Sequence, residues 1–151
     1  MKTTAIAGFV LSAALLCAGC ATTATNGTYI ENSGYNYRYI TYITDDAVSK
    51  ITQVLPPAKT QLNLANADTL SDKDLFGKSL INGLRQHGFA ATTGIPDTDS
   101  SFLPLTYALS NLDTPNNFHV VINIGNYQFS RLYRADKAGN ILPATMWTVR
   151  R

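Results

Sequence analysis

The sequence predicts an α+β protein in which two helices pack on a small, mainly antiparallel sheet, as a single domain after an N-terminal leader and a short tether. Two segments, beginning near residues 44 and 71, carry apolar residues at helical spacing. From about residue 89 onward, short alternating segments are separated by turns. Consecutive short strands of this kind are typical of an antiparallel meander.

Residues 1–19 have the features of a signal peptide. Lys2 precedes AIAGFVLSAALLCAG, an uncharged run of 15 residues, and the chain then becomes polar. Such a run has the size of the apolar core of a secretory signal and is short for a membrane span.

The only cysteines, Cys17 and Cys20, have the CxxC spacing of redox and metal sites. Their position favours a processing signal instead. Ala18-Gly19-Cys20 fits the end of a bacterial lipoprotein signal, in which the cysteine receives diacylglyceryl and becomes the first residue, although Cys17 stands where Leu is usual. Ordinary cleavage after Ala21 is the alternative. We expect lipid attachment at Cys20 and loss of Cys17 with the leader.

Cleavage before Cys20 leaves 132 residues, enough for one domain. We expect residues 20–35, small and polar, to form a lipidated flexible tether, and residues 36–151 to form the globular domain. The residue after the cysteine is Ala21 rather than the aspartate that usually retains lipoproteins at the inner membrane. The expected location is therefore the outer membrane, with the domain anchored by lipid and facing the periplasm.

The charge balance argues against direct nucleic-acid binding. Loss of Lys2 leaves eleven Lys and Arg against ten Asp and Glu, a net charge of +1. Affinity for nucleic acid depends largely on basic side chains that neutralise phosphates. The expected contact with the membrane is through the acyl chains.

The segment YNYRYITYIT is rich in tyrosine. Tyr35, Tyr37 and Tyr39 alternate with other residues, a period of two that predicts a strand over Tyr35–Thr44. We favour a strand of the domain's own sheet. The alternative is an aromatic face or free strand that a partner captures, with these three tyrosines as its contacts.

The first helix is predicted to start at Thr44 as its cap and to stop at Pro56-Pro57. Its stripe is formed by Ala47, Val48, Ile51 and Leu55. Asp45 and Asp46 would lie in the positive first turn. An acid/base pair is the alternative interpretation, but neighbours in sequence diverge on a helix.

The strand TQLNLAN is followed by a second predicted helix, opening at Ser71 with Asp74 in a capping box. Gly88 would end it in a left-handed conformation, with His87 in its last turn. Further strands are predicted in FAATT, LPLTYALSNL, a hairpin about Gly125-Asn126, and ILPATMWTVRR after the turn KAGN.

Catalytic motifs are missing from the sequence. There is no P-loop, GxGxxG, GxSxG or HExxH, and His119 lies in an apolar strand. Asp97 and Asp99 alternate like calcium ligands but lack the glycine and distal glutamate of an EF-hand. We expect no enzyme activity, no catalytic residue, no cofactor and no metal. Trp147, the only tryptophan, is predicted to pin the last strand onto the helices, with a binding hot spot as the alternative.

Four runs in this order resemble the conjugal transfer protein TrbH family: PPAKTQLNL, DLFGKSLINGLRQHGFA, LPLTYALSNL and VVINIGNYQFSRLYRADKAGNILPATMWTVRR. The resemblance covers about Asp45 to Arg151. Its most specific parts are PPA, the pair Gly88-Phe89 and the ending around Pro143, Trp147 and Val149. The family contributes no active site; only the acylated cysteine carries over, onto Cys20.

The resemblance implies a lipoprotein of the mating-pair-formation type IV secretion system, with a structural or assembly role; Ala21 after the cysteine places it at the outer membrane. Its implied partners are other channel proteins, in a ring of like or unlike subunits. The alternative is a stand-alone periplasmic lipoprotein that recognises a glycan or peptide through the tyrosine-rich segment.

Overall fold

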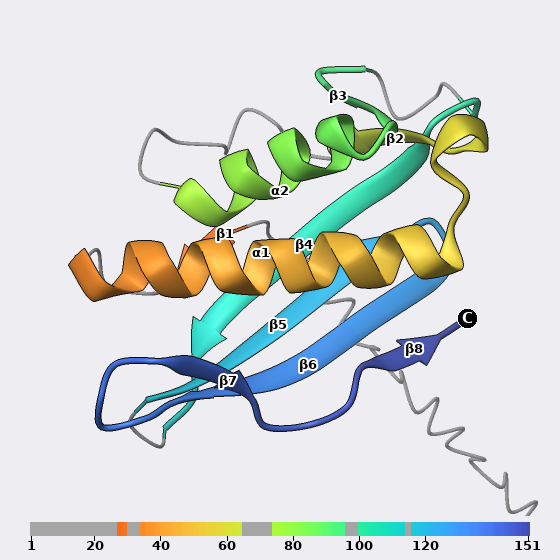
Figure 1. The fold of residues 1–151 in the computed structure, drawn as a ribbon. Coiled ribbons are helices and arrows are strands. Elements are labelled where there is room, and N and C mark those ends of the chain that lie inside the picture. Colours follow the sequence, from red (N-terminus) through yellow and green to blue (C-terminus); the bar gives the residue numbers. More distant parts are fainter. Residues whose placement is uncertain (1–26, 30–33, 65–73, 96–99, 114–115) are drawn as a thin grey trace, which may run out of the picture.

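The computed structural model describes residues 27–29, 34–64, 74–95, 100–113 and 116–151. These residues form two α-helices, a short 3₁₀ helix and one sheet of eight strands (Figure 1). In chain order the elements are β1 (Gly27–Tyr29), α1 (Gly34–Val54), η1 (Pro57–Lys59), β2 (Gln61–Leu64), α2 (Leu75–Gln86), β3 (Ala90–Thr93), β4 (Leu103–Asn111), β5 (Asn117–Ile124), β6 (Tyr127–Ala135), β7 (Ile141–Pro143) and β8 (Thr148–Arg150). The predicted α+β class is confirmed.

The sheet is mixed. Its main order is β3-β2-β4-β5-β6-β7, with β1 beside β4 and β8 beside β6. From β4 onward all pairs are antiparallel, as the meander predicts, and the β5–β6 hairpin turns at Gly125, whose φ is +56°. The pairs of β2 with β3, β2 with β4 and β1 with β4 are parallel. The pair of β2 and β3 is parallel because α2 forms the crossover between them.

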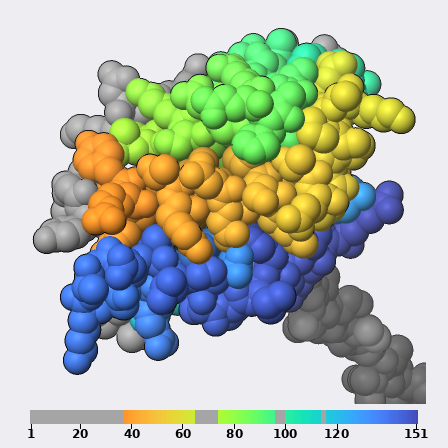
Figure 2. All heavy atoms as spheres, in the orientation of Figure 1, coloured from red at the N-terminus to blue at the C-terminus, as the bar shows by residue number. Residues whose placement is uncertain are grey.

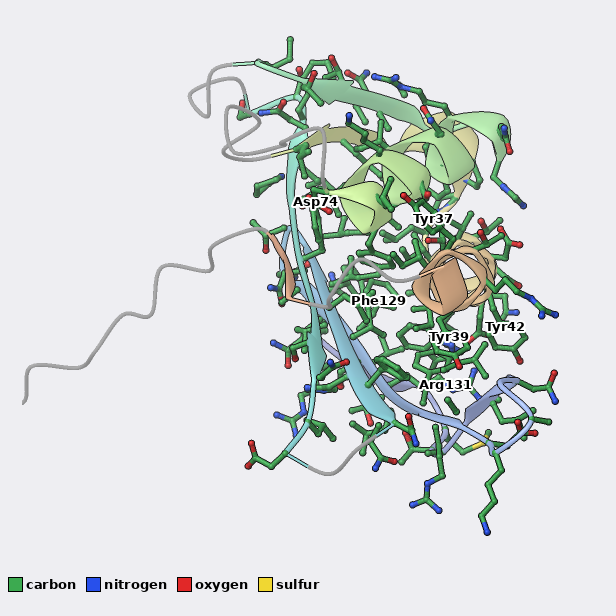
Figure 3. All side chains as sticks on the ribbon, turned by 90° about the vertical axis from the view of Figure 1, so that its left-hand side faces the viewer. Tyr37, Tyr39, Tyr42, Asp74, Phe129 and Arg131 are labelled. Atoms are coloured by element: carbon green, nitrogen blue, oxygen red, sulfur yellow. The ribbon has the colours of Figure 1, made fainter. Side chains whose placement is uncertain are left out.

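Both helices lie on the same face of the sheet, which Figure 3 shows nearly edge-on. α1 lies between α2 on one flank and the C-terminal strands on the other, as the colours of Figure 2 show. The core between the layers includes Ile43 and Ile51 of α1, Leu80 of α2, and Leu109 and Phe129 of the sheet, each 0% exposed. The alternation predicted for β4 is confirmed, because Leu105, Tyr107 and Leu109 all face this core.

The helix α1 is much longer than the sequence predicts. The expected strand over Tyr35–Thr44 is wrong, because those residues form the first part of α1. The expected cap Thr44 is also wrong: it lies inside the helix, 3% exposed, and its hydroxyl has no partner among the described residues. The end of the helix, before Pro56, is as predicted, and so is its apolar stripe, because Ala47, Val48, Ile51 and Leu55 are all buried.

The second helix confirms its predicted end and revises its start. Gly88, with φ of +87°, follows the cap His87, as expected for a left-handed terminus. The N-cap is Asp74, whose Oδ1 accepts a hydrogen bond from the Gly77 N–H at 2.9 Å. Ser71, predicted to open the helix, lies outside the described residues.

The sheet also begins earlier than the sequence predicts. A tether was expected over residues 20–35, but Gly27–Tyr29 pairs with Ala108–Ser110 of β4 and α1 starts at Gly34. Three residues are too few to show a periodicity, and their partner strand lies about 80 residues away in the chain. No helix among the described residues is both long and apolar enough to cross a membrane.

Candidate functional site

The predicted site residues divide between described and undescribed parts of the chain. Cys20, the expected lipid attachment residue, lies outside the described residues, as do Asp97 and Asp99. Tyr35 belongs to α1, but its side chain is not among those described. The structure therefore informs on two of the three predicted contact tyrosines, Tyr37 and Tyr39.

The helical turn separates these two side chains. Tyr39 is 8% exposed, and its ring packs against that of Phe118 with centroids 5.4 Å apart. Tyr37 is 54% exposed and lies on the flank of α1 that faces α2 (Figure 3). Tyr42, which sequence reasoning did not single out, is 40% exposed on the other flank, toward the C-terminal strands. The structure thus leaves Tyr37 and Tyr42 open to a partner and places Tyr39 in the core.

The sequence does show that this segment is helical when a longer stretch of it is considered. Tyr39, Ile40, Ile43, Ala47, Val48 and Ile51 follow the helical repeat, and all are buried. The alternation of three tyrosines covers only five residues, whereas the helical pattern continues through Asp45 and Asp46 without a break. The two aspartates therefore lie in the middle of α1, and the prediction that they occupy its first turn is wrong.

Asp46 is the centre of a polar cluster between α1 and the C-terminal strands. Its Oδ2 accepts hydrogen bonds from Arg131 Nη1 at 2.7 Å, Tyr133 Oη at 2.6 Å and Trp147 Nε1 at 3.1 Å. The side chains of Arg131 and Asp46 are 13% and 26% exposed, so their ion pair is largely withdrawn from water. An anionic acceptor with several donors is among the stronger polar interactions in proteins.

Aromatic rings pack around this cluster. Tyr133 and Trp147 meet edge to face with centroids 6.5 Å apart, and the Arg131 guanidinium lies 5.7 Å from the centroid of each ring. Arg131 Nε also donates to the Thr145 carbonyl at 2.8 Å. These contacts hold the segment before β8 against α1, which confirms that Trp147 pins the last strand onto the helix.

A second carboxylate plays a similar part under α2. Asp74, 6% exposed, accepts a hydrogen bond from the Tyr107 hydroxyl at 2.7 Å, while its other oxygen caps the helix. Burial, followed by the hydrogen bond to Asp74, raises the pKa of Tyr107 well above its ordinary value. Burial and the hydrogen bond to Asp46 raise the pKa of Tyr133 in the same way. Each carboxylate therefore joins a helix to the sheet through a neutral tyrosine.

A shallow hollow of about 260 Å³ opens between α1 and the turn that joins β6 to β7. It is lined by Arg38, Tyr39, Tyr42, Gly139, Asn140 and Ile141. The turn is braced by Asp136, whose Oδ1 accepts hydrogen bonds from the backbone N–H groups of Ala138 and Asn140 at 2.9 and 2.8 Å. These bonds lower the pKa of Asp136, with the two Asn140 donors making the largest contribution.

The two histidines do not form a site with other titratable groups. His87 Nδ1 lies 2.9 Å from the Gly83 carbonyl at the end of α2, as its predicted place in the last turn implies. His119 lies on the sheet face opposite the helices, and partial burial lowers its pKa. Within the described ranges, no three His, Cys, Asp or Glu side chains are grouped as a metal site would require.

The model of one protein family matches nearly all of this chain. The family is described as conjugal transfer protein TrbH, and the match covers residues 23–151. Neither the curated proteins nor the solved structures include a significant match. The matched range includes every element of the fold.

Replacing Asp46 by Asn is expected to lower the free energy of unfolding by about 2 kcal/mol, because Arg131 would keep a largely buried charge without its partner. Asp45→Asn is the matched control, since Asp45 is the exposed neighbour on the same helix; it should change stability by less than about 0.5 kcal/mol. Urea unfolding measures both. Equal effects of the two changes would contradict a structural role for the Asp46 cluster.

The buried tyrosines predict a loss of stability at alkaline pH. Tyr107 and Tyr133 have raised pKa values in the folded chain, whereas an unfolded chain ionises tyrosine near pH ~10. Their contribution to the stability of the folded state is fully present below that pH and is lost as the pH rises above it. Urea unfolding between about pH 9 and 11 should show that the free energy of unfolding declines with pH. The decline should be shallower in the double variant Tyr107→Phe, Tyr133→Phe. An unchanged slope in the double variant would count against this assignment.

Proposed function

The chain belongs to the conjugal transfer protein TrbH family, and from this premise we propose that it is a structural subunit of a conjugative type IV secretion apparatus, anchored to the outer membrane through lipid on Cys20. Family membership implies a role in conjugal transfer. The structural role, the lipid anchor and the location go further and are our proposal.

The chemistry of the described residues supports a structural rather than a catalytic role. The two carboxylates with buried partners, Asp46 and Asp74, accept hydrogen bonds from tyrosines and tie helices to the sheet. A general base must instead be free to take a proton from a substrate. The exposed aromatic side chains Tyr37 and Tyr42 are the type of residue found at protein–protein interfaces.

The short distance in sequence between Cys20 and β1 supports a domain held close to the membrane. Seven residue steps separate Cys20 from Gly27, the first residue of β1. Even a fully extended chain spans no more than about 25 Å over such a length. A lipid on Cys20 would therefore keep the start of β1 within that distance of the bilayer surface, so that the domain could contact neighbouring envelope proteins.

The proposal is tested by deletion and complementation in conjugating cells. Deletion should abolish plasmid transfer without affecting plasmid replication, and the wild-type gene should restore it. Cys20→Ser should fail to incorporate radioactive palmitate, leave the outer-membrane fraction and restore little transfer, because the acyl chains provide the attachment. Palmitate labelling, membrane fractionation and transfer frequency are the measurements.

Cys17→Ser is the matched control, since Cys17 is expected to leave with the signal peptide. This variant should incorporate palmitate, fractionate with the outer membrane and restore plasmid transfer as the wild type does. Undiminished label in Cys20→Ser, or a mature N-terminus at Thr22, would contradict the anchor. Normal transfer in the deletion strain would contradict the proposed role in the apparatus.

A further inference from the structure

The first turns of α1 present an aromatic surface to solvent. We define the α1 surface as Tyr37, Arg38, Thr41 and Tyr42, all of which are exposed. The solvent side of a surface helix usually carries charged and polar side chains. Here two of four exposed positions are tyrosine, 54% and 40% exposed, and only Arg38 is ionised. Tyrosine is among the residue types enriched at protein–protein interfaces.

The hollow beside this surface is of a size that suits one side chain. Its volume of about 260 Å³ lies below the range of about 300–1,000 Å³ typical of pockets for free ligands. Tyr39, Tyr42 and Ile141 supply apolar walls, and Arg38 lies at the same hollow. An aromatic or aliphatic side chain of a protein partner therefore fits it better than a free small molecule does.

Among the described residues that line the hollow, Arg38 alone carries a charge. Arg38 has no ion-pair partner among the described residues, and Lys137 is exposed in the adjoining turn. The carboxylate of Asp136 in that turn offsets the charge of Lys137 and accepts hydrogen bonds from Ala138 and Asn140. Asp45 is the exposed carboxylate on the next turn of α1, beyond Tyr42. Charge complementarity therefore favours a partner that brings a carboxylate to Arg38.

Two other modes of contact fit the surface less well. In a contact between two copies through this surface, Arg38 would find only Asp45 or Asp136 as an acidic partner, and the Asp136 carboxylate is already bound by donors of its own turn. Sheet extension has little to build on, because α1 is helical and the adjacent strand β7 is three residues long. β7 also ends at Pro143, which has no N–H to donate.

We propose that the α1 surface and the hollow bind a carboxylate-bearing segment of another protein of the transfer apparatus. One aromatic or aliphatic side chain of that segment enters the hollow, and an Asp or Glu nearby pairs with the Arg38 guanidinium. Tyr37 and Tyr42 cover the segment on either side. The identity of the partner as a transfer protein rests on the proposed function, whereas its chemistry rests on the surface.

The test is photo-crosslinking in conjugating cells with the full chain. p-Benzoylphenylalanine at position 41 replaces exposed Thr41 and leaves Arg38 and Tyr42 in place. Gln53, exposed on the same helix but twelve residues further on, or about 18 Å away, is the control position. We expect position 41 to crosslink to one transfer protein at a segment containing Asp or Glu and an apolar side chain, and position 53 to give little product.

Charge reversal tests the proposed pair. Arg38→Glu, combined with the probe at position 41, should reduce the crosslinked product by about tenfold, because like charges would then meet. Lys59→Glu reverses an exposed charge away from the hollow and should leave the product unchanged. Replacing the partner's Asp or Glu by Lys should restore the crosslinked product with Arg38→Glu. Such a recovery would not occur if Arg38→Glu had simply unfolded the protein.

Several outcomes would overturn the inference. The inference fails if position 41 gives no crosslink, or crosslinks only to a second copy of this chain or to a segment without Asp or Glu. It also fails if the crosslinked product persists in Arg38→Glu. If deletion abolishes transfer but Arg38→Glu keeps both the crosslink and transfer, the inference fails while the proposed function stands. If deletion has no effect on transfer, the proposed function fails first.

Discussion

The carboxylate of Asp46 lies where three parts of the chain meet. It belongs to α1, and its hydrogen-bond donors come from β6 and from the segment before β8, 85 to 101 residues later in the sequence. Because hydrogen bonds weaken steeply outside a limited range of distances and donor angles, three donors on one oxygen constrain both the height and the rotation of α1 over the sheet. With Asp46 turned toward β6, Tyr39 and Ile43 face the core, while Tyr37, Arg38 and Tyr42 remain in solvent. The proposed interaction surface therefore depends on this interaction.

Apolar burial supplies most of the stability, and the polar cluster selects one arrangement. Fully burying a large side chain contributes about 1.5–3 kcal/mol, and the core contains many such side chains from both layers. Apolar burial is non-directional and depends mainly on the area removed from water. If α1 were rotated, the Asp46 carboxylate would move away from Arg131. Both charges would then lack a partner in a partly buried place, which lowers stability. Asp74 and Tyr107 act in the same way for α2, close to the start of that helix.

Much of the fold could be predicted from local patterns, and what was missed depends on distant contacts. The hairpin at Gly125, the alternation in β4 and the helix end at Gly88 each depend on residues close together in the chain. The strand predicted over Tyr35–Thr44 is wrong because the alternation of three tyrosines covers only five residues. The helical repeat of the same segment becomes clear only when the sequence up to Ile51 is included. The strand β1 and the parallel pairing of β2 with β4 join segments far apart in sequence, and no local pattern marks them.

The candidate site shows the same limit more sharply. Sequence reasoning placed Tyr37 and Tyr39 together as contacts, but only the structure shows that one is exposed and the other buried. Nothing near Asp46 in the chain indicates Arg131, Tyr133 or Trp147 as its partners. The hollow is likewise formed by α1 and a turn about 100 residues later. Residue type predicted an aromatic interface, and the three-dimensional contacts determined which tyrosines can form it.

The most direct test of the central role of Asp46 uses the only tryptophan as a reporter. In Asp46→Asn under native conditions, we expect Trp147 emission to shift to longer wavelength and acrylamide to quench it more strongly, because the indole N–H loses its anionic acceptor and the segment before β8 moves away from α1. Circular dichroism should still show the helices. Emission and quenching identical to those of the wild type, in a folded Asp46→Asn protein, would show that Asp46 does not hold this segment against α1.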